Sequence, residues 1–137
     1  MKKIYLATPV NGRKEKTLHE KMKAALANIQ AMAKIVIKAY PDAEFMSSFE
    51  IPAIRVLVNN HSVALPSEAR IMGECVRMVM ECDMIVLDDG WECSQGCTVE
   101  RFVAMQYGKQ VKTINSFKLN EVLKDIDKLA EEQLKTK

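Results

Sequence analysis

Short, nearly continuous apolar runs alternate along this chain with longer stretches in which apolar residues recur every three or four positions. A continuous run is typical of a parallel strand covered on both faces, and the longer spacing is typical of a helix with one buried face. The predicted strands are Lys3–Thr8, Ala43–Ser47, Met84–Leu87 and Val111–Ile114.

The helical stretches lie between and after these runs. The first ends at Tyr40-Pro41, because proline disfavours helical backbone in the residue before it. Pro66 fits the first turn of the second helix, and Gly108 is a natural C-cap for the third. The predicted helices are Leu18–Tyr40, Ile71–Cys82, Thr98–Tyr107 and Leu119–Lys135.

The segment Ser48–Leu65 has the weakest pattern. It contains one apolar run, Ile54–Val58, followed by four polar residues. A short apolar run does not show a period, so two interpretations stay open. The segment is either an additional strand or an active-site loop.

Alternating strands and helices predict an α/β fold. We expect a three-layer sandwich, Rossmann- or flavodoxin-like, with a parallel sheet of four to five strands and right-handed crossovers. A chain of 137 residues fits one domain, 1–137. Ligands of such sheets bind at the carboxyl ends of the strands. The segments Pro9–Arg13 and Asp88–Gly96 are therefore the predicted binding loops.

The charges nearly cancel, with 20 basic and 18 acidic residues and a net charge of +2. This balance argues against the strong basic field that nucleic-acid-binding proteins use. No apolar stretch approaches the ~18 residues of a membrane span. The run after Met1-Lys2-Lys3 is too short for a signal peptide. We therefore expect a cytoplasmic protein that binds neither nucleic acid nor membrane.

Four cysteines are present. Cys75 and Cys82 fall on one helix face, where free cysteine behaves as a small hydrophobe. Cys93 and Cys97 lack a second Cys or His pair at zinc-site spacing. We expect no metal, no cofactor and no disulfide, and redox or metal sensing through Cys93 and Cys97 stays an alternative.

The loop that leads into the third helix carries the chemistry. Ser94, Gly96 and the helix N-terminus offer hydroxyl and backbone N–H donors that suit a phosphate or sugar oxygen. Glu100 lies about one turn into the helix, and its side chain can project back over these donors at the helix N-terminus. A carboxylate there also simply stabilises the helix N-terminus. Trp91 is either a loop anchor or a surface on which a base stacks.

Several motifs together resemble the nucleoside 2-deoxyribosyltransferase-like superfamily, including its 2′-deoxynucleoside 5′-phosphate N-hydrolases. The resemblance spans roughly residues 1 to 114, and the wording after Gly90 is similar to a small bacterial and phage branch. The motifs are Tyr5-Leu6-Ala7-Thr8-Pro9-Val10-Asn11-Gly12, Cys82-Asp83-Met84-Ile85-Val86-Leu87, Gly90-Trp91-Glu92-x-Ser94-x-Gly96-x-x-x-Glu100 and Ala104-x-x-x-Gly108-Lys109.

The resemblance implies a role for each matching position. Glu100 corresponds to the nucleophile that attacks C1′ of the deoxyribose, and Tyr5 to the tyrosine that orients it. Asp83 corresponds to an aspartate that assists near the departing base, and Ser94 to a serine that contacts the 5′-phosphate. From the residues alone, Asp83 also fits a turn aspartate, and Tyr5 also fits a core tyrosine. Further substrate-binding candidates are Pro9, Asn11, Gly12, Arg13, Asp88, Trp91 and Gly96.

The expected activity is cleavage or transfer at the N-glycosidic bond of a 2′-deoxynucleoside or its 5′-monophosphate, through a covalent deoxyribosyl intermediate. In the nucleotide-hydrolysing branch the first loop is rich in glycine and arginine. Asn11 stands here in place of an arginine, and Arg13 or Arg70 are its candidate substitutes. A ribonucleotide phosphoribohydrolase and a non-catalytic nucleotide-binding module are the alternatives. The resemblance also implies a homodimer or a dimer-based oligomer.

Overall fold

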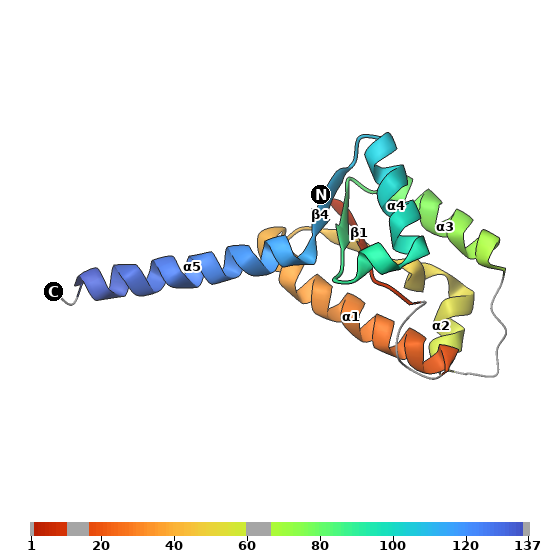
Figure 1. The fold of residues 1–137 in the computed structure, drawn as a ribbon, viewed down its shortest axis with the longest axis horizontal. Helices are drawn as coiled ribbons and strands as arrows, with labels where there is room; N and C mark the ends of the chain where they lie inside the picture. The colour runs from red at the N-terminus through yellow and green to blue at the C-terminus, as the bar shows by residue number, and fades with distance from the viewer. Residues whose placement is uncertain (1, 11–16, 60–66, 136–137) are drawn as a thin grey trace.

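A four-stranded parallel sheet forms the centre of the computed structural model, which describes residues 2–10, 17–59 and 67–135 (Figure 1). The strand order is β2-β1-β3-β4, and every neighbouring pair is parallel. The strands are β1 (Lys3–Ala7), β2 (Glu44–Met46), β3 (Met84–Leu87) and β4 (Gln110–Thr113). The predicted α/β sandwich is confirmed.

Helices cover both faces of this sheet. Figure 1 shows α1 on one side and α3 with α4 on the other. This cover explains why β3 is buried along its whole length, as its continuous apolar sequence predicts. The helices are α1 (Leu18–Ala39), α2 (Pro52–Asn59), α3 (Glu68–Glu81), α4 (Gln95–Gln106) and α5 (Ile114–Lys135).

Local sequence signals set the helix ends. The side chains of Thr17 and Ser67 accept hydrogen bonds from the first turns of α1 and α3. Gly108 has a φ of 70° directly after α4, the left-handed conformation that ends many helices, so its predicted role is confirmed. Pro66, predicted in the first turn of α3, lies outside the described residues.

The structure corrects two predicted elements. The described part of Ser48–Leu65 is neither strand nor open loop, but a 3₁₀ turn η1 (Ser48–Glu50) followed by α2. Pro52 occupies the first position of α2, and Ile54, Leu57 and Val58 form its buried face. The second corrected element is the last helix. Ile114 was predicted to end a strand, but it begins α5, so this helix is longer than predicted.

The chain connections diverge between the two central strands. The chain leaves β1 toward β2 through α1, and it leaves β3 toward β4 through α4 on the opposite face. The carboxyl ends of β1 and β3 therefore form a topological switch point, where α/β sheets bind ligands. The Thr8 hydroxyl donates to Asp88 Oδ2 across this point at 2.7 Å.

Candidate active site

Glu100 is a buried carboxylate on the inner face of α4. Only 6% of its surface is exposed, and it shares that face with Cys97 and Ala104. A lone buried carboxylate is costly unless it is hydrogen-bonded or protonated. Its position therefore needs a specific partner.

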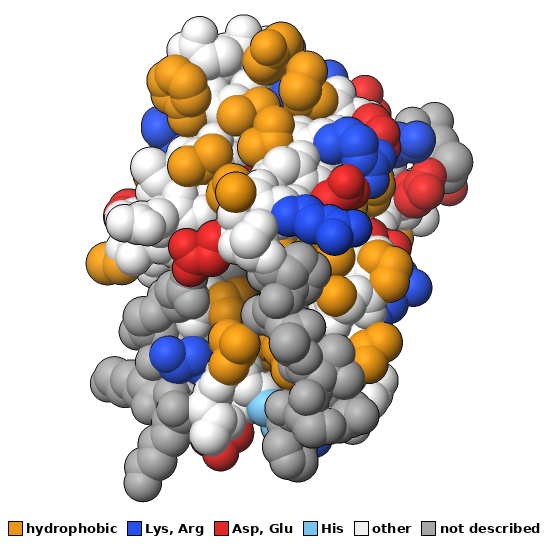
Figure 2. All heavy atoms as spheres, turned by 90° about the vertical axis from the view of Figure 1, so that its right-hand side faces the viewer, with side chains coloured by type: hydrophobic (Ala, Val, Ile, Leu, Met, Phe, Trp, Pro, Cys, Tyr) orange, Lys and Arg blue, Asp and Glu red, His pale blue; other side chains and the backbone are white. Residues whose placement is uncertain are grey.

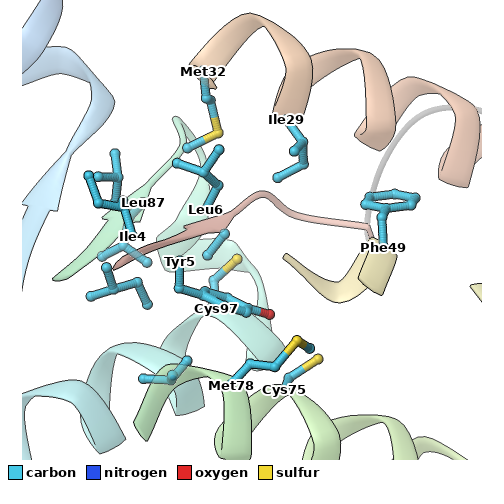
Figure 3. Packing of buried hydrophobic residues seen from close by; sticks show 14 of the residues in the cluster. Ile4, Tyr5, Leu6, Ile29, Met32, Phe49, Cys75, Met78, Leu87 and Cys97 are labelled. Atoms are coloured by element: carbon cyan, nitrogen blue, oxygen red, sulfur yellow. The ribbon is translucent and has the colours of Figure 1, made fainter. Parts of the chain in front are cut away.

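Tyr5 supplies that partner. Figure 3 shows Leu6 pointing toward Met32 on α1, whereas Tyr5 points to the other side of the sheet, where Cys75 and Cys97 lie. This alternation follows from the strand period of two. The Tyr5 side chain is 1% exposed, and it is hydrogen-bonded to Glu100. The structure thus brings together two residues that lie far apart in the sequence.

Burial dominates the electrostatics of this pair. It raises the pKa of Glu100 to about 7, and the hydrogen bond with Tyr5 acts in the opposite direction. Burial, together with the charge of Glu100, also raises the pKa of Tyr5 well above its ordinary value. Near neutral pH, Glu100 is therefore divided between a neutral acid and a poorly solvated carboxylate, a state suited to catalysis.

Cys75, on α3, is a third member of this cluster that sequence reasoning missed. Its thiol is hydrogen-bonded with Tyr5. Burial, and after it the charge of Glu100, raises the pKa of Cys75 to about 11. The thiol therefore stays neutral at physiological pH. No signal in the sequence separates Cys75 from the other apolar residues on its helix face.

The reactivity of the four cysteine thiols tests this packing directly. Burial raises the pKa of Cys82 to about 11 and that of Cys97 to about 12, whereas Cys93 is exposed. Because the thiolate is the reactive form, we expect one rapidly reacting thiol, Cys93, in the native protein and four after unfolding. A thiol titration with and without denaturant measures both numbers. Rapid native reaction of Cys75 would contradict the closed Tyr5 cluster.

Polar groups at the start of α4 lie at the carboxyl edge of the sheet, near the switch point. Ser94 Oγ caps the helix by accepting from the Cys97 amide at 3.2 Å. The amides of Gln95 and Gly96 have no acceptor in the described part of the chain. Among the described residues, a Cβ atom at Gly96 would meet only Ser94 Oγ, at 3.9 Å, so the described part of the fold leaves this space open.

The other binding candidates lie around this opening. Asp88 follows β3, and its backbone amide donates to Ala7 at 2.9 Å. Gly90, with a φ of 82°, approaches the Pro9 ring. The Trp91 ring lies 5.0 Å from the Arg101 guanidinium, which supports its interpretation as a loop anchor.

Asp83 is not brought to this site. It precedes β3, so it lies at the amino edge of the sheet, where its Oδ2 accepts from the Lys3 amide at 2.9 Å. Its side chain is exposed and is absent from the charges that act on Glu100. This position favours the turn aspartate, the alternative that the residues alone already offered, over the role that the resemblance implies for Asp83. The remaining loop candidates, Asn11, Gly12 and Arg13, lie outside the described residues.

Charged side chains of both signs lie close together on the face shown in Figure 2. Arg70, a candidate substitute in phosphate binding, lines a depression between η1 and α3 together with Glu50, Glu74 and Arg77. Arg77 is paired with Glu74 at 3.0 Å. Within the described residues, no group of three His, Cys, Asp or Glu side chains could hold a metal ion. No described helix is long and apolar enough to cross a membrane.

The architecture of this chain is similar to that of a protein of known structure, and its sequence matches a family model. A "2-desoxiribosyltransferase from Leishmania mexicana" matches 82% of this chain with a TM-score of 0.51 and 20% identity, which shows a shared fold. The match spans 63% of that chain. No curated protein matches the sequence. A family model described as a "Domain of unknown function (DUF4406)" matches residues 2–113, all but the last helix. The chain therefore belongs to the DUF4406 family, on a fold like that of a deoxyribosyltransferase.

Proposed function

We propose that this protein cleaves or transfers at the N-glycosidic bond of a 2′-deoxynucleoside or its 5′-monophosphate. The observation that carries the proposal is the buried Glu100 carboxylate hydrogen-bonded to Tyr5, beside the switch point of the sheet. A carboxylate held below an anomeric carbon is what an oxocarbenium-like transition state requires. The fold shared with a deoxyribosyltransferase supports the same chemistry.

Glu100 acts as the nucleophile in the proposed reaction. Its carboxylate oxygen forms a bond to C1′ while the bond from C1′ to the base nitrogen breaks. The electron pair of that bond leaves with the base, which takes a proton from solvent. In the second step, water or another base forms a bond to C1′ and loses a proton to solvent, while the bond from C1′ to Glu100 breaks and the carboxylate is released.

Tyr5 and Cys75 act on this step through Glu100. The Tyr5 hydroxyl, itself in contact with Cys75, fixes the carboxylate and favours its charged form. Asp88 provides a second carboxylate at the same edge, held by the Thr8 hydroxyl. We assign Asp88 to the sugar hydroxyls, since a carboxylate accepts hydrogen bonds from them.

Gly96 and the amides at the start of α4 are proposed to bind a sugar or phosphate oxygen. Gly96→Ala should raise KM about tenfold, because its methyl group fills the space that the ligand oxygen needs. Gly73→Ala is the matched control, since the structure leaves open space around that helical glycine too. Both changes favour helix, so neither should lower the melting temperature. Equal KM values for the two variants would contradict this binding role.

A chromatographic assay for free base tests the proposed function. The protein is incubated with the four deoxynucleosides and their 5′-monophosphates, with and without an added acceptor base. We expect base release from at least one substrate and none from Glu100→Gln. Dependence on the acceptor separates transfer from hydrolysis, and preference for the monophosphates reveals phosphate recognition. Binding of these compounds without turnover would contradict the proposal in favour of a binding module.

A further inference from the structure

Helix α5 carries an apolar stripe that the described residues of the chain do not cover. Only Ile114 and Phe117, in its first turns, are buried. Beyond them the helix extends away from the body of the protein (Figure 1). Six large apolar side chains along it are each between 49% and 73% exposed: Leu119, Val122, Leu123, Ile126, Leu129 and Leu134.

The stripe is a second face of α5, separate from the one that holds the helix to its own domain. The attached face contacts α1 through Phe117, whose ring lies 6.2 Å from that of Tyr40, and through Glu121, paired with Lys38 at 3.3 Å. Leu119, Val122 and Ile126 follow each other by three and four residues, which places them along one line of the helix. At about 100° per residue, this line lies on the side of the helix opposite Phe117.

We infer that this stripe is a self-association surface, and that its partner is α5 of a second copy of this chain. Isolated helices are only marginally stable in water, and helices in proteins gain most of their stability from packing of an amphipathic face. The extended part of α5 has such a face, and residues 2–10, 17–59 and 67–113 provide no partner for it. Roughly 100 Å² from each of six side chains, on both copies, gives on the order of 1,000 Å², the lower limit for a specific interface.

The charges beside the stripe favour an antiparallel pair of identical helices. Lys118, Asp125 and Glu132 are spaced by seven residues, so they lie along the same edge. In a parallel pair this edge would face the other edge of the second helix, where Leu123 and Ala130 carry no charge. In an antiparallel pair it faces the same edge, so Lys118 of each copy meets Glu132 of the other, and the two Asp125 side chains lie between these pairs. This arrangement is two-fold symmetric and closes at a dimer. In the single chain, Lys118 has a weak exposed pairing with Asp89 at 3.7 Å.

A second exposed apolar group lies on the outer face of α4, with Val99, Phe102 and Met105. Figure 2 shows hydrophobic side chains gathered over the upper part of the molecule, where Figure 1 places α4. Unlike α5, α4 is held in place by its buried face. It therefore needs no partner to remain helical. Its apolar group is the alternative dimer surface, and Phe102→Glu tests it.

Sedimentation analysis of the full chain tests the inference. We expect a dimer that dissociates on dilution, and a dissociation constant raised at least about a hundredfold in Ile126→Glu/Leu129→Glu. The double variant should also lose helical circular dichroism as α5 frays. The control variant Lys124→Glu/Lys128→Glu changes the charge of α5 by more than Ile126→Glu/Leu129→Glu does, but on the polar face of the helix. It should remain dimeric. A monomer at all concentrations would overturn the inference. So would a dimer that survives the α5 change and is lost with Phe102→Glu.

The antiparallel arrangement has its own test. Lys118→Glu should weaken the dimer, and adding Asp125→Lys and Glu132→Lys in the same chain should restore it. Failure of the restoring changes would contradict the antiparallel arrangement. These measurements use no substrate, so their outcome is independent of the proposed catalytic activity.

Discussion

Replacing Glu100 with glutamine should abolish turnover and stabilise the protein at the same time. The loss of the nucleophile is expected to lower kcat by at least about a thousandfold, equivalent to ~4 kcal/mol of transition-state stabilisation. Glutamine keeps the shape of the side chain and its capacity to accept from Tyr5. The change therefore removes the charge of a residue that is only 6% exposed while leaving its packing in place.

The gain in stability should depend on pH with a definite sign. The folded-state pKa of Glu100, about 7, lies above the ordinary value of 4.5. Between these values the folded protein binds the extra proton, so the wild type loses stability as the pH rises. The loss is complete above about pH 7 and is on the order of 3 kcal/mol. Glu100→Gln should thus match the wild type near pH 4 and exceed it at pH 8.

Urea unfolding at the two pH values measures the difference. Asp83→Asn is the control, because this exposed carboxylate at the opposite edge should retain activity within about threefold. A Glu100→Gln protein that is destabilised at pH 8 would contradict the expectation that the charged, buried Glu100 carboxylate lowers the stability of the wild type. A Glu100→Gln protein that retains activity would contradict the nucleophile itself.

Tyr5→Phe should move the pH dependence of the reaction. In the wild type, kcat/KM should fall about tenfold per pH unit below about 7, as Glu100 becomes protonated. Phenylalanine removes the hydrogen bond that favours the charged form, so the pKa of Glu100 rises and the acid limb shifts to higher pH. We expect a loss of about 10- to 100-fold at pH 7, partly recovered at pH 9.

The pH profile separates two roles for Tyr5. A shifted midpoint means that the hydroxyl sets the ionisation of Glu100. A profile of unchanged shape, lowered equally at every pH, would contradict that role. Unfolding measurements on Tyr5→Phe control for the loss of the hydroxyl from a fully buried position, where its contact with Cys75 also disappears.

Much of the fold was predictable because the pattern of burial is simple. β3 is apolar at every position and was predicted with its observed bounds, since helices cover both sides of it. The short apolar run within α2 was not assigned, because five residues do not distinguish a helical period from a strand. Ile114 ends an alternating Val111-Lys112-Thr113-Ile114 pattern in sequence, and only the structure shows that it begins a helix.

Part of the candidate site was predictable: the loop and helix pattern indicated Ser94, Gly96 and Glu100, and the family resemblance added Tyr5. Tyr5 and Glu100 were named from motifs, and their contact depends on strand order that no local pattern encodes. Asp83 precedes a parallel strand and so lies at the amino edge of the sheet, whereas ligands of such sheets bind at the carboxyl edge, and this placement favours a turn aspartate. Cys75 was missed because a buried cysteine gives the same signal as any small apolar residue.

The most direct test of the account is to trap the covalent intermediate. The protein is mixed with a deoxynucleoside or deoxynucleotide that it turns over, quenched in acid, and digested for mass spectrometry. The account predicts one added deoxyribosyl group on the α4 peptide that contains Glu100, and its absence in Glu100→Gln. Base release that continues in Glu100→Gln, with no modified peptide in the wild type, would contradict it.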